Sequence, residues 1–204
     1  MTPSASSSRI ASQLGLAERI FAGPRARRLI DGVEAGLDRV DANLERELHI
    51  SDALADATSR YLFDAGGKRV RPMLALLTAH LGDGVTEDVV EAATALELTH
   101  LGSLYHDDVM DDADKRRGVP SAHSVWGNNI AILTGDLLFA RASQIMARLG
   151  EGAIRLQANT FERLVLGQMH ETVGPTDADD RVAFYLQVLA DKTGSLIAAA
   201  AQSG

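Results

Sequence analysis

Apolar residues along this chain recur at helical spacing rather than at the two-residue period of a half-buried strand. No stretch alternates apolar and polar positions over a sustained run, and no internal repeat is present. Turn signals rich in Gly, Pro and Asp instead separate segments of helical length. The pattern therefore predicts an all-α fold in which short loops join antiparallel neighbours.

The turn signals also predict where the helices begin and end. A break near 49–52 divides the first helical segment, with Ser51 as a candidate cap for its second part. Pro72 suits the first turn of a helix, and Thr86 followed by two acidic residues is a good helix start. The predicted helices cover about 27–63, 72–81, 86–112, 129–149, 152–172 and 179–200, with a loop at 115–120.

The composition favours one helical domain. The chain has 204 residues, of which 46% are hydrophobic and only 4% aromatic. This length is enough for a substantial core, and much of the apolar content is Ala, Leu and Val, which favours packed helices over a sandwich or barrel. We expect residues 1–25 to be loosely ordered and residues 26–204 to belong to the domain.

Charge and cysteine usage exclude several classes of function. The formal net charge of −8 argues against general nucleic-acid binding, and the absence of Cys excludes disulfides, zinc–thiolate sites and thiol nucleophiles. We identify no apolar run long enough to span a bilayer and no apolar signal core near the N-terminus. The sequence therefore predicts a soluble, cytoplasmic protein without a transmembrane segment.

The segment His-Asp-Asp-Val-Met-Asp-Asp at 106–112 carries candidate chemistry. In a helix Asp107 and Asp111 share one face, as do Asp108 and Asp112. Like charges at this spacing destabilise a helix, so we expect a cation between them. Mg²⁺ typically takes one or two carboxylates and completes its shell with water and substrate phosphate. The alternative interpretation is a solvated acidic helix end.

Two basic segments accompany the aspartates. The segment Gly-Gly-Lys-Arg-Val-Arg-Pro at 66–72 combines a close-approach backbone with guanidinium forks for phosphate oxygens, and Lys-Arg-Arg-Gly at 115–118 follows the aspartates. A basic loop alone is more often simply solvated. Carboxylates and cations in separate blocks suit a polyanionic phosphate substrate better than a surface salt-bridge patch. Small and apolar residues before the aspartates predict either a pocket below them or ordinary core packing.

Taken together, these segments resemble the trans-type polyprenyl (isoprenyl) diphosphate synthases, with the best match to long-chain synthases of actinobacterial type. The resemblance runs from about residue 45 to the end and keeps the family's order and spacing. The matching segments are 66–72, 96–100, 103–111, 116–121, 135–138, 167–168 and 192–196.

The resemblance implies a partial isoprenoid-synthase-type helical bundle and head-to-tail condensation of isopentenyl diphosphate with an allylic diphosphate. Asp107 and Asp111 would bind Mg²⁺, with Asp108 in support, so that the metal stabilises the leaving diphosphate. The catalytic set would be Asp107, Asp108, Asp111, Arg116 and Lys192. Isopentenyl diphosphate would bind Lys68, Arg71, His100 and Arg117, and the allylic diphosphate would bind Arg116, Lys192, Thr193 and Gln168.

The same resemblance places a chain-length gate just before the aspartates. The gate positions Gly102 and Ser103, and Thr99 below them, are all small. Bulky aromatic residues there shorten the product in this family. A medium-to-long polyprenyl product is therefore expected.

The chain departs from the family in one respect. The family carries a second aspartate-rich motif on a later helix, and this chain ends before such a motif could appear; the acidic stretch 177–180 precedes the Lys192 motif and is no substitute. The last residues, 196–204, form an apolar segment without a cap. We therefore expect that the chain is the N-terminal portion of a synthase domain, or that a second chain covers this apolar face. We also expect severe loss of activity in the isolated chain.

Three hypotheses remain open at this stage. The first is a Mg²⁺-dependent prenyltransferase, and the second is a non-catalytic or partner-dependent subunit of one. A homodimer or heterodimer is expected in either case. The third is a class I terpene cyclase, against which the segment 66–72 argues, because a cyclase holds no isopentenyl diphosphate.

Overall fold

The computed structural model describes residues 23–204 and is built almost entirely of helices. The expected loose order of residues 1–25 lies outside the description for 1–22, whereas Pro24 and Arg25 already belong to the first described helix. The elements are α2 (Pro24–Leu48), α3 (Ala53–Asp64), α4 (Val70–Ala79), α5 (Glu87–Met110), β1 (Lys115–Arg116), β2 (Val119–Pro120), α6 (Ala122–Trp126), α7 (Asn128–Leu149), α8 (Glu151–Val173), α9 (Arg181–Leu189), the π-helix η2 (Ala190–Gly194) and α10 (Ser195–Gln202).

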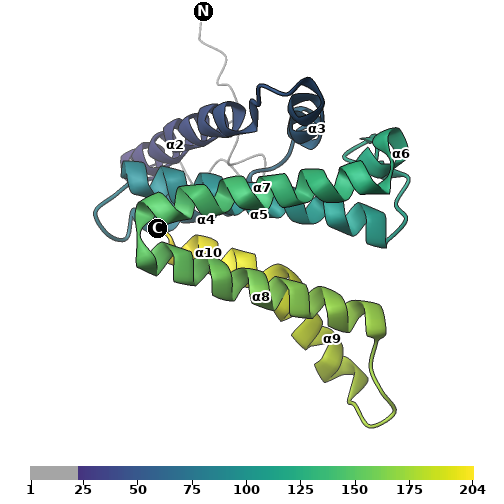
Figure 1. Cartoon of the computed structure of the whole chain (residues 1–204). Helices are drawn as coiled ribbons and strands as arrows, with labels where there is room; N and C mark the ends of the chain where they lie inside the picture. Colours follow the sequence, from purple (N-terminus) through teal and green to yellow (C-terminus); the bar gives the residue numbers. More distant parts are fainter. Residues whose placement is uncertain (1–22) are drawn as a thin grey trace, which may run out of the picture.

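Helix α5 forms the centre of the molecule. Its buried residues, among them Val90, Leu96 and Leu101, surround the helix instead of forming one stripe, as expected of a helix covered on all sides. Helix α7 runs antiparallel to α5, while α2 and α3 lie on one side of this pair and α8–α10 on the other (Figure 1). The all-α prediction is confirmed. The C-terminal end of α5 faces the C-terminal end of α8.

Two of the predicted helix starts can be compared directly with the structure. Thr86 caps α5 as predicted, because its hydroxyl accepts a hydrogen bond from the Val89 N–H at 3.3 Å. The break before α3 is also confirmed, but the cap is Asp52 rather than Ser51. The Asp52 carboxylate accepts from the Ala55 N–H at 2.9 Å.

Helix α5 is shorter than predicted. It ends at Met110 with Asp111 as its C-cap, and Asp112 adopts a left-handed φ of 48°. The predicted helical pairing of Asp108 with Asp112 is therefore wrong. Asp107 and Asp111 do occupy the last turn together, since the Asp111 N–H donates to the Asp107 carbonyl at 2.8 Å.

The predicted loop at 115–120 is a small antiparallel hairpin. Lys115 pairs with Pro120 and Arg116 with Val119. The two turn residues, Arg117 and Gly118, have φ of 54° and 84°, which matches the left-handed backbone of a tight hairpin turn. The hairpin turns the chain back so that Arg116 and Arg117 face α3 and α5 instead of extending into solvent.

The predicted helix 179–200 is divided in two. Asp180 caps α9, accepting from the Val182 and Ala183 N–H groups, and the π-helix η2 then interrupts the run before α10. Gly167 of α8 lies against this π-helix, where an added Cβ would be 2.6 Å from the backbone nitrogen of Lys192. Single π turns occur frequently at functional sites, and this one carries Lys192.

Helix α7 corrects the expectation that no segment could span a membrane. Within residues 23–204 it is the one helix whose length and composition would allow it, and 39% of its most apolar window is buried. Ala131, Leu138, Ala142 and Ile145 of α7 pack into the core. A core helix passes the same test, so length and composition are weak evidence for a membrane span.

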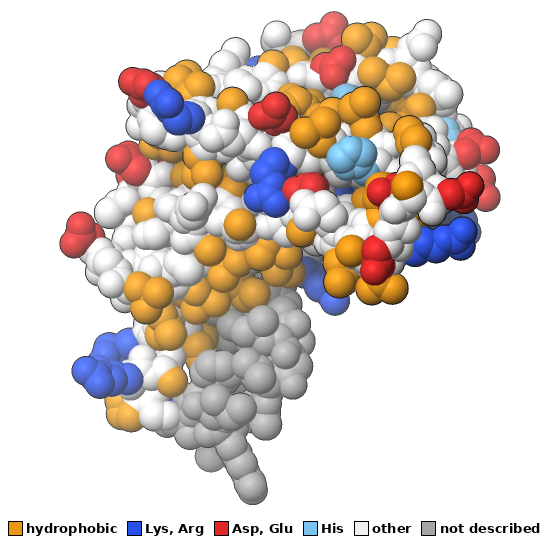
Figure 2. Space-filling view, turned by 90° about the horizontal axis from the view of Figure 1, so that it is seen from below, with side chains coloured by type: hydrophobic (Ala, Val, Ile, Leu, Met, Phe, Trp, Pro, Cys, Tyr) orange, Lys and Arg blue, Asp and Glu red, His pale blue; other side chains and the backbone are white. Residues whose placement is uncertain are grey.

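Large hydrophobic side chains also remain exposed on α8, α9 and α10. Figure 2, which views the molecule from below Figure 1, shows hydrophobic atoms spread among polar ones over this face. The exposed residues of these helices include Leu166, Val173, Val182, Tyr185, Leu186, Leu189 and Ile197.

Candidate active site

The acidic cluster, consisting of Asp107, Asp108, Asp111 and Asp112, lies at the C-terminal end of α5. Burial raises the pKa of Asp107, the charge of Lys192 opposes this, and the neighbouring Asp111 raises it further. A divalent cation between Asp107 and Asp111 would relieve both effects. Among residues 23–204 no group of three or more His, Cys, Asp or Glu side chains could hold a metal. Two hard carboxylates still fit Mg²⁺, which needs few protein ligands when a substrate phosphate supplies others.

Asp108 has a different role from its neighbours. Its side chain is fully buried, and one carboxylate oxygen accepts a hydrogen bond from Arg116 Nε at 2.7 Å and forms an ion pair with Nη2 at 2.5 Å. The other oxygen is buried without a hydrogen-bond partner. Asp108 therefore fixes Arg116 of the hairpin beside the acidic cluster, and it is not exposed toward the opening as Asp111 is.

Besides Arg116 on the hairpin, the residues expected at the allylic diphosphate lie opposite the acidic cluster, on α8 and η2. Gln168 lines the same cavity as Asp107, and its buried Oε1 has no hydrogen-bond partner. Lys192 forms an ion pair with Glu171 and is close enough to lower the pKa of Asp107. Thr193 is exposed on the π-helix. The structure thus brings Lys192 and Gln168 to the acidic cluster, as the sequence predicts.

The residues expected at isopentenyl diphosphate gather about two helical turns before the acidic cluster, around His100 of α5, while Lys68 lies exposed on the loop before α4. Burial lowers the pKa of His100 to about 2, and the charges of Arg71 and Arg117 add to the effect. His100 is therefore neutral near neutral pH and can donate a hydrogen bond but adds no charge. Arg117 donates to the Leu62 carbonyl at 2.6 Å and to the Gly66 carbonyl, and Arg71 Nε is buried without a partner.

Two further members of this region were not identified from the sequence. Arg69 is buried with a left-handed φ of 50°, pairs with Asp41 at 2.8 Å, and lies 3.6 Å from Glu97. Its guanidinium also sits over the Phe63 ring, with its carbon 4.7 Å from the ring centroid. Glu97 itself is only 2% exposed. An acidic residue inside the mostly apolar run 92–98 was the available signal, since buried carboxylates need cationic partners.

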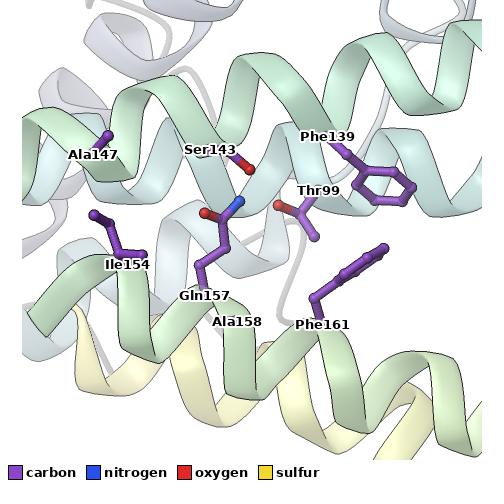
Figure 3. Close-up of a pocket in the computed structure, with 8 residues that line it drawn as sticks. All are labelled: Thr99, Phe139, Ser143, Ala147, Ile154, Gln157, Ala158 and Phe161. Atoms are coloured by element: carbon purple, nitrogen blue, oxygen red, sulfur yellow. The ribbon is translucent and has the colours of Figure 1, made fainter. Parts of the chain in front are cut away.

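Two cavities lie in line behind the acidic cluster, between α5, α7 and α8. The near cavity, of about 190 Å³, is bordered by Asp107 and Ser103, and the far cavity, of about 340 Å³, by Thr99. Phe139 and Phe161 border both cavities, and their ring centroids are 4.5 Å apart. Figure 3 shows these two rings facing each other from α7 and α8 at one end of the far cavity.

The three predicted gate positions therefore differ in placement. Ser103 and Thr99 border the near and the far cavity respectively, which fits the predicted apolar pocket below a polar opening. Gly102 borders neither. An added Cβ there would be 3.0 Å from the Gly135 carbonyl oxygen, so Gly102 allows α5 and α7 to pack closely. The sequence did not identify Phe139 and Phe161, because they are distant in sequence from the aspartates.

Known proteins of one family are similar to this chain. A family model described as polyprenyl synthetase matches residues 52–204. The nonaprenyl diphosphate synthase of Mycobacterium tuberculosis is 49% identical over 84% of this chain and 52% of its own length. The heptaprenyl diphosphate synthase component 2 of Geobacillus stearothermophilus is 40% identical over 82% of this chain and 53% of its own.

Solved structures are similar over a comparable share of this chain. A polyprenyl synthase from Caulobacter crescentus, complexed with calcium and isoprenyl diphosphate, has a TM-score of 0.81 at 31% identity, covering 87% of this chain and 54% of that one. The geranylgeranyl pyrophosphate synthase of Corynebacterium glutamicum, with the same ligands, has a TM-score of 0.78 at 43% identity, covering 90% and 55%. The chain spans about half the length of the relatives it matches.

Proposed function

Because the chain belongs to the polyprenyl synthetase family, we propose that it takes part in the head-to-tail condensation of isopentenyl diphosphate with an allylic diphosphate. The observation that carries this proposal is the position of Asp107 and Gln168, which line the same apolar cavity from α5 and α8, with Lys192 near Asp107. Since the chain spans about half the length of its relatives, we assign to it the part of the site formed by the first aspartate cluster.

Mg²⁺ is the metal we propose for Asp107 and Asp111. When bound, it would supply positive charge that stabilises the departing allylic diphosphate. Crystals of two relatives contain calcium with isoprenyl diphosphate, which supports a divalent cation at this family's site. Arg116, fixed by Asp108, and Lys192 would contact the same diphosphate and keep it oriented.

The second diphosphate would bind at Lys68, Arg71, Arg117 and the neutral His100. Arg71 Nε is buried without a partner, and a phosphate oxygen would provide one. In this proposal, isopentenyl diphosphate would lie beside the allylic group that it attacks. The apolar cavities behind the aspartates would hold the growing chain and exclude water, which would otherwise capture the allylic cation.

The proposed product is of medium-to-long chain length. Ser103 and Thr99 are small, so the near cavity is not blocked at the positions next to the aspartates. The narrowing at Phe139 and Phe161 lies deeper, between the near and the far cavity. A chain that passes this pair would enter the far cavity.

A second candidate function is that of a partner-dependent subunit. It is favoured by the similarity to a protein named as component 2 of a heptaprenyl diphosphate synthase, and by the exposed hydrophobic side chains of α8–α10. In this case the acidic cluster would bind substrate only when a second chain, of the same or another kind, covers these helices.

Prenyl transfer by the purified chain distinguishes the two functions. The reaction would contain Mg²⁺, labelled isopentenyl diphosphate and geranylgeranyl diphosphate, with an Asp107→Ala chain as control. Long labelled product that the control lacks would support the enzyme. Product that appears only after a companion chain is added would support the subunit. Failure to bind either diphosphate, both alone and with the companion chain, would refute both.

A further inference from the structure

The buried carboxylate of Glu97 lies at the centre of an arginine cluster formed by Arg69, Arg71 and Arg117. These arginines come from two separate segments, the start of α4 for Arg69 and Arg71 and the hairpin turn for Arg117, and all three interact electrostatically with Glu97. Glu97 Oε1 is 3.6 Å from Arg69 Nη1, and Oε2 is buried without a hydrogen-bond partner. Glu97 is therefore the shared counter-charge of cations that would otherwise repel one another.

Arg69 connects this carboxylate to the rest of the fold. It is only 5% exposed and is held by Asp41, by the Phe63 ring and by packing against Gly67. It therefore has no exposed surface to offer a ligand. Its neighbours differ in burial: Lys68 is exposed, and Arg71 is half-buried and retains an unpartnered Nε.

We propose that Glu97 is a positioning residue that gathers the arginine cluster and limits its affinity for diphosphate. The proposal rests on the proposed function, because it assigns the arginine cluster to a diphosphate. Without ligand, Glu97 balances the guanidinium charges and keeps them together. With ligand, the diphosphate and Glu97 compete for the same guanidinium groups, so the carboxylate lowers the affinity while it stabilises the empty site.

This role predicts opposite changes in two measurements on a Glu97→Gln chain. The variant should unfold at lower temperature than the wild type when no anion is present, because the arginines lose their counter-charge. It should bind inorganic pyrophosphate about tenfold more tightly, because the competing negative charge is gone. A residue with only a structural role would lower stability without tightening binding.

The experiment measures thermal unfolding and calorimetric binding of pyrophosphate for the wild type, Glu97→Gln and Glu91→Gln. Glu91 is a matched control, because it lies on the same helix but pairs with Arg148 at 3.6 Å, outside the cluster. Tighter binding in Glu97→Gln alone would support the proposal. Equal or weaker binding in that variant would overturn it.

Two further outcomes are also decisive. If the Glu97→Gln chain is unfolded, the proposal requires that pyrophosphate restores the folded chain where chloride at equal ionic strength does not. A chain that pyrophosphate fails to restore would count against the proposal. If the wild type and Glu91→Gln do not bind pyrophosphate at all, the diphosphate site itself, and with it the proposed function, is wrong.

Discussion

Replacing Asp108 by Asn should destabilise the protein far more than the same replacement at Asp112. Asp108 is fully buried, accepts a hydrogen bond from Arg116 Nε and forms an ion pair with Nη2 of the same guanidinium, whose side chain is 31% exposed. Removing one partner of a buried ion pair costs about 3–5 kcal/mol. Asn retains one acceptor and Arg116 is partly hydrated, so we expect a smaller loss in the free energy of unfolding, of about 2–3 kcal/mol.

Asp112→Asn is the matched control for this change. Asp112 belongs to the same cluster but is exposed, and its left-handed φ of 48° is one that Asn adopts readily. Its replacement should change the free energy of unfolding by less than about 0.5 kcal/mol.

Urea unfolding followed by circular dichroism measures both changes, provided that the dependence on urea concentration has the same slope in each chain. For a chain of this size the expected loss in Asp108→Asn corresponds to a fall in melting temperature of about 4–12 °C. Equal midpoints for Asp108→Asn and Asp112→Asn would refute the reasoning, because Arg116 would then not depend on the buried carboxylate.

Three further predictions concern the pocket and His100. His100→Gln should flatten the pH dependence of the free energy of unfolding. The pKa of His100 is lowered to about 2 from 6.5, so on acidification the unfolded chain binds a proton that the folded chain does not bind. Between about pH 7 and pH 5 the wild type should therefore lose about 1–2 kcal/mol more than the variant in urea titrations, and parallel profiles would contradict this. Ser103→Phe should fill the near cavity and weaken the binding of geranylgeranyl diphosphate more than that of farnesyl diphosphate, as measured by calorimetry. The ratio of the two affinities should change about tenfold if one isoprene unit loses its burial, and an unchanged ratio would exclude Ser103 as a gate. Phe161→Ala should join the two cavities and change the same ratio in favour of the longer diphosphate, whereas a ratio like that of the wild type would show that the aromatic pair does not limit chain length.

The helices could be predicted because their signals are local. Thr86 followed by acidic residues predicts the start of α5, and Gly66 and Gly67 predict the gap between α3 and α4. The hairpin at 115–120 was not predicted, because each strand has only two residues and shows no alternation. The π-helix at 190–194 was missed for a related reason, since it depends on the close approach of Gly167 from another helix.

Residue type and spacing alone single out the aspartates as candidate metal ligands, whereas Lys192 was expected only from the family resemblance. The structure places Lys192 close enough to Asp107 to lower its pKa. The roles of Arg69 and Glu97 depend instead on burial, which the sequence does not reveal. Arg69 stands between Lys68 and Arg71 in a basic loop, yet only the folded chain shows that it faces inward to Asp41 and Glu97.

The measurement that tests the central claim most directly is the Mg²⁺ dependence of geranylgeranyl diphosphate binding by this chain. We predict that calorimetry detects binding with Mg²⁺, that chelation of the metal weakens it strongly, and that Asp107→Ala weakens it to the level of the chelated wild type. Binding that is indifferent to both Mg²⁺ and Asp107 would contradict the account, because the acidic cluster would then not be part of a diphosphate site.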